Sequence, residues 1–178
     1  MRRFWIFAFV LSGLVPASSP AVRVTPVVAD GRVYASFTAP TAYGDDTERA
    51  VQTGLPLTFT FLIDLRRPST IWFDRTIGSA TVSSSVKFDN LTHVYQVSKL
   101  NDGRVYWSQT TDKADQARSW ATAFDRVPLV AGEPLEPNSD YYVRVRVLLT
   151  PRRSLSLWSL WPFGGDDGAG RADFTFIR

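Results

Sequence analysis

His93 is the only histidine in a chain of 178 residues that contains no cysteine. A Ser-His-Asp triad would have to use this imidazole, but the sequence has no Gly-x-Ser-x-Gly motif to present a nucleophilic serine. A single histidine also excludes a multi-histidine zinc site, and the lack of cysteine excludes thiolate metal ligands. Residues 90–93 are typical of a turn between strands, so we expect His93 to lie on the surface. These residues predict a protein that is not an enzyme and uses neither a metal nor a cofactor.

Two acidic pairs, Asp45-Asp46 and Asp166-Asp167, lie in glycine-containing stretches where carboxylates could bind calcium. Neither pair has the oxygen-ligand spacing of an EF-hand loop or of a glycine-rich calcium repeat. We therefore interpret both pairs as solvated turn residues.

Three arginines and one aspartate occupy polar positions in the two strongest strand patterns of the chain. Asp64 and Arg66 lie in the first pattern, and Arg144 and Arg146 lie in the second. If the two strands are neighbours, these charges can form a cross-strand ladder. One interpretation is a charged face that only contacts water, because exposed ion pairs are common and weak. The sharper hypothesis is a site for an anion or an acidic partner at Arg66, Arg144 and Arg146.

Residues 155–163 are largely apolar without strand alternation, and they include Trp158, Trp161 and Phe163. Large exposed apolar patches mark contacts with partners or membranes. We expect these three side chains to contact an envelope protein, with peripheral membrane contact as a further hypothesis. The alternative is a flap folded over the open end of the domain.

Alternation of apolar and polar residues predicts that most of the chain is β-structure. The clearest run is 57–67, and Asp30-Gly31 and Asn101-Asp102-Gly103 are typical hairpin turns. The predicted hairpin arms are 22–28 with 32–38, and 94–100 with 104–110, with Val105 and Trp107 on the inner face. Further strands are predicted over 70–74, 141–150 and 172–177, and the serine-rich run 79–89 is predicted to be an edge or solvent-facing strand.

One full helix is predicted over 112–125, because Ala114, Ala117, Trp120, Ala121 and Phe124 form a single apolar stripe. Residues 47–53 are predicted to form two helical turns, ended by Gly54. Strands joined by hairpins, with one helix, favour a single domain over 22–178. We predict an antiparallel immunoglobulin-like β-sandwich. The alternative is a lipocalin-like β-barrel, which would enclose a cavity.

The first 21 residues have the features of a signal peptide: basic Arg2-Arg3, an apolar stretch over 4–15 and small residues over 16–21. Twelve apolar residues are fewer than the roughly 20 that span a bilayer, so we expect cleavage after Ala21 rather than a retained anchor. Cleavage would remove two of 20 basic and none of 17 acidic residues, leaving a net charge near +1. That charge gives no indication of nucleic-acid binding. An exported chain without cysteine fits the bacterial periplasm.

Several short stretches together resemble the bacterial exported proteins of domain-of-unknown-function family 4390. They occur in this order: Asp30-Gly31-Arg32, Gly54-Leu55-Pro56-Leu57-Thr58-Phe59, Trp72-Phe73-Asp74, Phe88-Asp89-Asn90-Leu91 and Tyr142-Val143-Arg144. The resemblance implies an all-β domain in the cell envelope and supplies no catalytic residue, cofactor or substrate. We therefore expect a periplasmic, non-enzymatic binding or protein-interaction module. A small-ligand carrier, or a hydrolase with an unrecognised site, are the alternatives.

Overall fold

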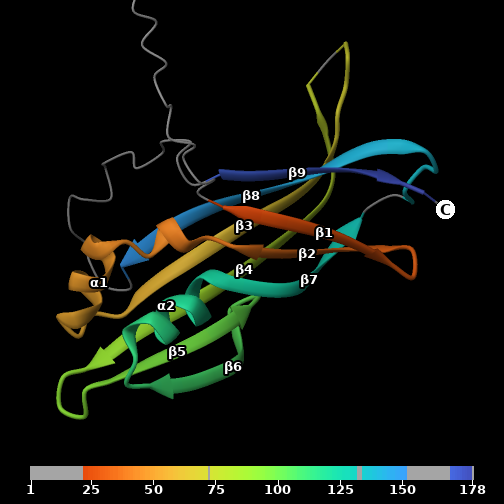
Figure 1. Ribbon diagram of the computed structural model, residues 1–178. Coiled ribbons are helices and arrows are strands. Elements are labelled where there is room, and N and C mark those ends of the chain that lie inside the picture. Colours follow the sequence, from red (N-terminus) through yellow and green to blue (C-terminus); the bar gives the residue numbers. More distant parts are fainter. Residues whose placement is uncertain (1–21, 72, 132–133, 152–168, 178) are drawn as a thin grey trace, which may run out of the picture.

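The computed structural model describes residues 22–71, 73–131, 134–151 and 169–177. Within these ranges the chain is mainly β, with a few short helices (Figure 1). The strands are β1 Arg23–Ala29, β2 Arg32–Thr38, β3 Leu57–Arg67, β4 Arg75–Asp89, β5 Val94–Asn101, β6 Arg104–Thr111, β7 Ala123–Ala131, β8 Ser139–Pro151 and β9 Ala169–Phe176. The helices are the 3-10 turn η1 Pro40–Ala42 and the α-helices α1 Asp45–Gln52 and α2 Ala114–Thr122.

Two antiparallel sheets make up the domain. The first has the order β1-β2-β7, and the second has the order β6-β5-β4-β3-β8-β9. The end of β7 crosses between them, because Val130 and Ala131 pair with Ser79 and Gly78 of β4. The mainly β, sandwich-like fold predicted from the alternation is therefore confirmed.

The sheets come together again where β9 lies beside β1 (Figure 1). A Cβ atom added to Gly170 would lie 2.6 Å from the carbonyl oxygen of Val22, so only glycine permits this close approach. In the described part of the chain no hydrogen-bonded ladder joins β1 to β9. The alternative of a closed lipocalin-like barrel is therefore wrong, and the finer immunoglobulin-like assignment stays a prediction.

The centre of the core is β3, which pairs with β4 along one side and with β8 along the other. Its inward side chains are all buried, as its alternation predicted: Leu57, Phe59, Phe61, Ile63 and Leu65. Phe61 packs 5.1 Å, centroid to centroid, from both Phe37 of β2 and Phe124 of β7. These aromatic contacts join the two sheets, because aromatic rings bury large apolar areas in tilted arrangements.

Both hairpins predicted from glycine-containing turns are confirmed. Asp30 and Gly31 have φ angles of 51° and 69°, as a type I′ turn requires, and Val24 pairs with Phe37. In the second hairpin the register shifts between Lys99 and Leu100. Val105 therefore pairs with Leu100 and is exposed, contrary to the expected inner position, whereas Trp107 packs against the core.

The position predicted for the serine-rich run is wrong. β4 is a central strand that begins four residues before the predicted start at Ser79, and it pairs with β3, β5 and β7. Two of its serines make hydrogen bonds to other elements, Ser83 with Thr60 of β3 and Ser84 with α2. Ser84 is fully buried and donates to the carbonyl oxygen of Ala121 in α2 at 2.6 Å. A buried hydroxyl with a partner is compatible with a central strand.

Two further boundaries differ from the expectations. The described residues of the predicted strand 70–74, which are 70, 71, 73 and 74, do not form a strand, because the β3–β4 ladder ends at the pair Arg67 and Arg75. The second α-helix ends at Thr122, three residues early, because Ala123 becomes extended and pairs with Thr38 in β2. Residues 123–131 form β7, a strand not predicted from the sequence.

The remaining elements follow the expected pattern more closely. α1 starts two residues before the predicted helical turns, with Asp45, Asp46 and Glu48 in its first turn. Negative charge is favourable there because of the helix dipole. β9 begins three residues before the predicted final strand, and its Phe174 and Phe176 pack against the core.

Replacing Ser84 by alanine should destabilise the fold by about 1–3 kcal/mol, because it leaves the buried Ala121 carbonyl without its donor. Chemical denaturation monitored by circular dichroism measures this loss. Ser79→Ala is the matched control, since Ser79 is exposed on the same strand and should change stability by less than about 0.5 kcal/mol. Equal effects of the two substitutions would contradict the assigned role of Ser84.

Candidate functional site

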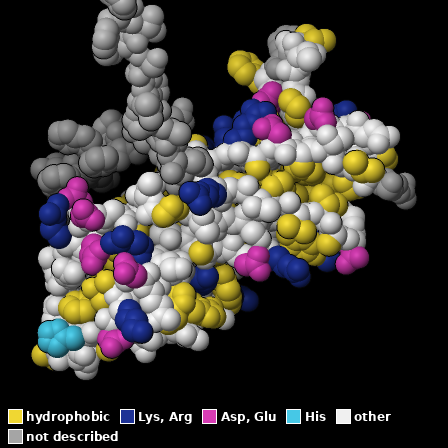
Figure 2. Space-filling model, viewed as in Figure 1, with side chains coloured by type: hydrophobic (Ala, Val, Ile, Leu, Met, Phe, Trp, Pro, Cys, Tyr) yellow, Lys and Arg dark blue, Asp and Glu magenta, His cyan; other side chains and the backbone are white. Residues whose placement is uncertain are grey.

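The β3–β4 hairpin projects beyond the body of the sheets (Figure 1). Its end carries exposed apolar side chains. Ile71 is 84% exposed and Phe73 is 93% exposed. Hydrophobic side chains at the end of this projection, above a base crowded with charged side chains, are visible in Figure 2. We call Ile71 and Phe73 the hairpin tip. Exposed apolar residues of this size, on an element that points away from the core, are candidates for a contact surface.

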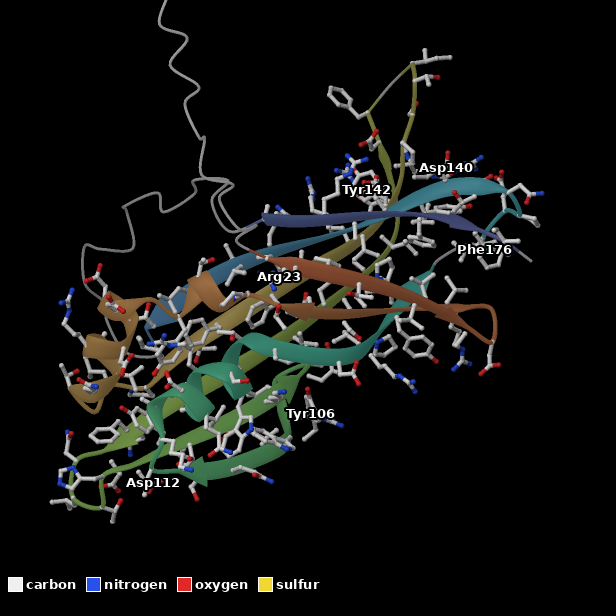
Figure 3. The ribbon with its side chains drawn as sticks, viewed as in Figure 1. Arg23, Tyr106, Asp112, Asp140, Tyr142 and Phe176 are labelled. Carbon is white, nitrogen blue, oxygen red and sulfur yellow. The ribbon has the colours of Figure 1, made fainter. Side chains whose placement is uncertain are left out.

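The base of the hairpin is held in place by Asp74. Its carboxylate accepts hydrogen bonds from the Tyr142 hydroxyl at 2.6 Å and from the backbone N–H of Ser69 at 3.1 Å. Arg66 donates to the Asp74 carbonyl oxygen at 2.7 Å. Tyr142 lies below the projecting loop in Figure 3, and the Arg171 guanidinium is 3.8 Å from its ring centroid. Three strands and the loop therefore contribute to one network.

These contacts also set the protonation of Asp74. The hydrogen bond from Tyr142, followed by that from Ser69, holds the pKa of the Asp74 carboxyl below its ordinary value. Burial, followed by the hydrogen bond to Asp74, raises the pKa of Tyr142. The pair is therefore a neutral phenol donating to a carboxylate, which is a short and strong hydrogen bond.

The predicted charge ladder is present on the outer face of β3 and β8. Asp64 is paired with Arg144 in the β-ladder, and its carboxylate accepts from Arg144 at 3.0 Å and from Arg146 at 3.2 Å. Asp64 is 15% exposed, whereas both arginines are more open to water. Arg66 follows on the same face but bonds to the loop carbonyl instead. The structure thus brings Arg66, Arg144 and Arg146 together; a partner at this face stays a prediction.

A second ion pair lies beside the hairpin base. Arg67 donates two hydrogen bonds to Glu136, at 2.5 and 2.7 Å, in the bidentate geometry that arginine makes with carboxylates. Arg75, directly opposite Arg67 in the ladder, also contributes to lowering the pKa of Glu136. Glu136 is therefore held by Arg67 and also lies within the electrostatic reach of Arg75.

An open groove of about 520 Å³ lies where β1, β2, β5 and the start of β7 meet. Lys99 is its central cation: the ammonium donates to the Ala123 carbonyl oxygen at 2.8 Å and lies 4.8 Å from the Phe124 ring centroid. Burial lowers the pKa of Lys99. Arg23 and Asp125 also line the groove, and Figure 3 shows Arg23 at the start of β1. Sequence reasoning missed this groove, because its residues come from four separated segments.

The other candidate residues are placed apart from both features. His93 is exposed on the β4–β5 turn with φ of 55°, and its ring lies 6.1 Å from that of Phe88. Asp45 and Asp46 are in the first turn of α1. The predicted interaction residues Trp158, Trp161 and Phe163, the pair Asp166-Asp167 and the predicted signal peptide lie outside the described residues.

Over the described ranges, no group of three or more histidine, cysteine, aspartate or glutamate residues is arranged to hold a metal ion. Neither α-helix in those ranges has the length and hydropathy needed to cross a bilayer. The hairpin tip itself was missed by the sequence reasoning, which interpreted 70–74 as a strand. The available signal was a run of adjacent apolar residues without polar alternation, flanked by Arg66-Arg67 and Arg75.

Tyr142→Phe should raise the pKa of Asp74 toward its ordinary value of 3.8, because the largest cause of its depression is removed. The ring that contacts Arg171 is retained. Asp74 in the native fold has a lowered pKa, so its contribution to stability is present above the unfolded pKa and is lost as pH falls through the folded pKa. The stability difference between Tyr142→Phe and the unchanged protein should therefore shrink below about pH 4.

Carboxyl-carbon NMR titration of Asp74, together with denaturation at several pH values, checks this expectation. Tyr106→Phe is the control, because Tyr106 is an exposed tyrosine on β6. An unchanged Asp74 titration in Tyr142→Phe would show that the hydroxyl does not control this carboxylate.

Comparison with known proteins identifies one family. The family model described as Domain of unknown function (DUF4390) matches residues 20–158, which covers most of the chain, including both arms of the projecting hairpin. No curated protein and no solved structure matched the chain. The resemblance noted in the strand and turn residues is therefore confirmed, and the chain belongs to the DUF4390 family.

Proposed function

We propose that this chain is a non-enzymatic binding module of the bacterial envelope, and that it contacts its partner through the hairpin tip. The observation that carries the proposal is the exposure of Ile71 and Phe73 at the end of a projecting hairpin. Removing a side chain of this kind from water stabilises a complex by about 1.5–3 kcal/mol. A contact that buries the tip would therefore gain binding free energy from apolar surface that is exposed to water in the isolated chain.

The network below the tip supports this role because it limits the motion of the hairpin. Asp74 fixes the two ends of the loop through Ser69 and Tyr142, and Arg67 fixes the end of β3 through Glu136. An element that is already ordered loses less conformational entropy on binding. A tip held in this way is better suited to binding than a loop that orders only in the complex.

The arginines on the outer face of β3 and β8 provide a polar surface beside the tip. Arg146 and Arg144 share the single carboxylate of Asp64, so this part of the face has more positive than negative groups. A polar rim around an apolar centre is the usual organisation of a binding surface. The proposal therefore includes Arg66, Arg144 and Arg146 as secondary contacts, and it retains the expectation for Trp158, Trp161 and Phe163.

The proposed location is the periplasm, with the chain exported by the signal peptide predicted over 1–21. Support comes from the basic, apolar and small-residue order of that segment and from the absence of cysteine. The immunoglobulin-like assignment of the sandwich belongs to the same proposal. His93, exposed beside Phe88, offers no support for the alternative of a hydrolase.

Photo-crosslinking in living cells tests the proposal directly. A photoreactive amino acid at Thr70, which is exposed next to the tip, should form adducts with a protein or a lipid of the envelope. The same group at Leu91, which is 92% exposed on the β4–β5 turn, should form few. Adding Ile71→Ser and Phe73→Ser should abolish the adducts formed from position 70. Absence of adducts of either kind from position 70 would contradict the proposed function.

The groove around Lys99 favours a second candidate, a carrier of small anionic ligands. Two cations, Lys99 and Arg23, and one carboxylate, Asp125, line this open groove over the almost fully buried rings of Phe37 and Phe124. Under this proposal, amide chemical shifts around Phe124 should change on titration with small aromatic carboxylates. The change should disappear in Lys99→Met and persist in Lys87→Met, which alters a lysine of β4 outside the groove. Unchanged shifts across the carboxylates would reject this candidate.

A further inference from the structure

We infer that the hairpin tip binds an anionic phospholipid surface. This inference rests on the proposed function, because it names the partner of the same tip. A protein needs no shaped pocket to bind a planar bilayer. A short apolar projection can enter the bilayer while the body of the domain stays in water. The tip has this form, with Ile71 and Phe73 at the end of a two-stranded arm (Figure 1).

The charges at the base of the arm match a layer of anionic headgroups. Residues 66–75 contain three arginines and one aspartate. Arg67 of β3 and Arg75 of β4 stand directly opposite each other in the ladder, with Glu136 as the carboxylate near both. Like charges directly opposite are destabilising in a sheet. Nearby, Arg66 bonds a carbonyl oxygen, and Arg144 and Arg146 share the one carboxylate of Asp64, so this side of the arm carries positive charge that an anionic surface within a Debye length would attract.

The arrangement of these arginines favours a membrane over a pocket on a protein. They come from both strands of the arm and lie immediately below the tip, so the basic groups flank the apolar residues on two sides. Further along the same face, Arg171 lies over the Tyr142 ring and pairs with Asp173, and Arg144 pairs with Asp64. Apolar residues that enter the acyl region, followed by arginines at the headgroup level, are the organisation of an interfacial anchor.

The chain contains no cysteine, so one introduced cysteine can carry a single environment-sensitive fluorophore. The full-length protein with Thr70→Cys, labelled with a nitrobenzoxadiazole group, is mixed with phosphatidylcholine vesicles that contain phosphatidylglycerol. The label should show a blue-shifted, several-fold brighter emission that is quenched by spin-labelled acyl chains. The signal should be much smaller with phosphatidylcholine alone and should decrease as the salt concentration rises.

Leu91→Cys with the same label is the matched control, because Leu91 is exposed at the other end of the 15-residue strand β4. That separation is roughly 50 Å. The label at 91 should not respond, even if another part of the chain attaches the protein to the vesicle. Adding Ile71→Ser and Phe73→Ser to the Thr70→Cys protein should reduce the quenched signal at least about tenfold.

Three results would overturn the inference: no response at position 70 with anionic vesicles, equal responses at positions 70 and 91, or equal responses with anionic and neutral vesicles. None of these three results decides the proposed function, which the photo-crosslinking experiment tests separately. Photo-adducts with a protein from position 70, combined with no response to vesicles, would keep the binding module and reject the membrane as its partner.

Discussion

The packing of β3 against the opposite sheet is the interaction on which the rest of the structure depends. Phe61 meets both Phe37 and Phe124, and this contact holds β2 and β7 over the centre of the larger sheet. Because β3 also pairs with β4 and β8 over most of its length, its register determines which side chains of both neighbours face outward. The polar face that carries Asp64, Arg144 and Arg146 is a direct consequence of burying the apolar one.

The hairpin tip depends on the same strand. β3 and β4 continue as a pair beyond the area covered by the other sheet, and the last residues of that pair are arginines. No core is available to cover the apolar residues that follow, so their exposure results from where the ladder ends. The loop is ordered by the hydrogen bonds of Asp74 with Tyr142 and Ser69, and not by packing against a core. These bonds order the loop without burying its end.

Much of the fold was predictable because the alternation in β3 and β8 is regular and the turn residues are specific. The ladder of Asp64 with Arg144 followed from the same regularity once the two strands were neighbours. The central position of β4 was not predictable in this way, because the partner of Ser84 lies 37 residues away in α2. Residues 70–74 illustrate a different limit. Isoleucine, tryptophan and phenylalanine favour strands locally, but whether they join a ladder is decided by the opposing segment.

The length of β4 gives the domain a mechanical property. Its 15 residues run from the hairpin tip to the β4–β5 turn, and they pair with β3 over 11 positions. A force on the tip along the hairpin axis pulls β3 and β4 together, so it would load in shear the ladders that join this pair to β8 and β5, rather than open their hydrogen bonds one at a time. A contact made at the tip would therefore transmit tension into the centre of the sheet, where the aromatic core resists sliding.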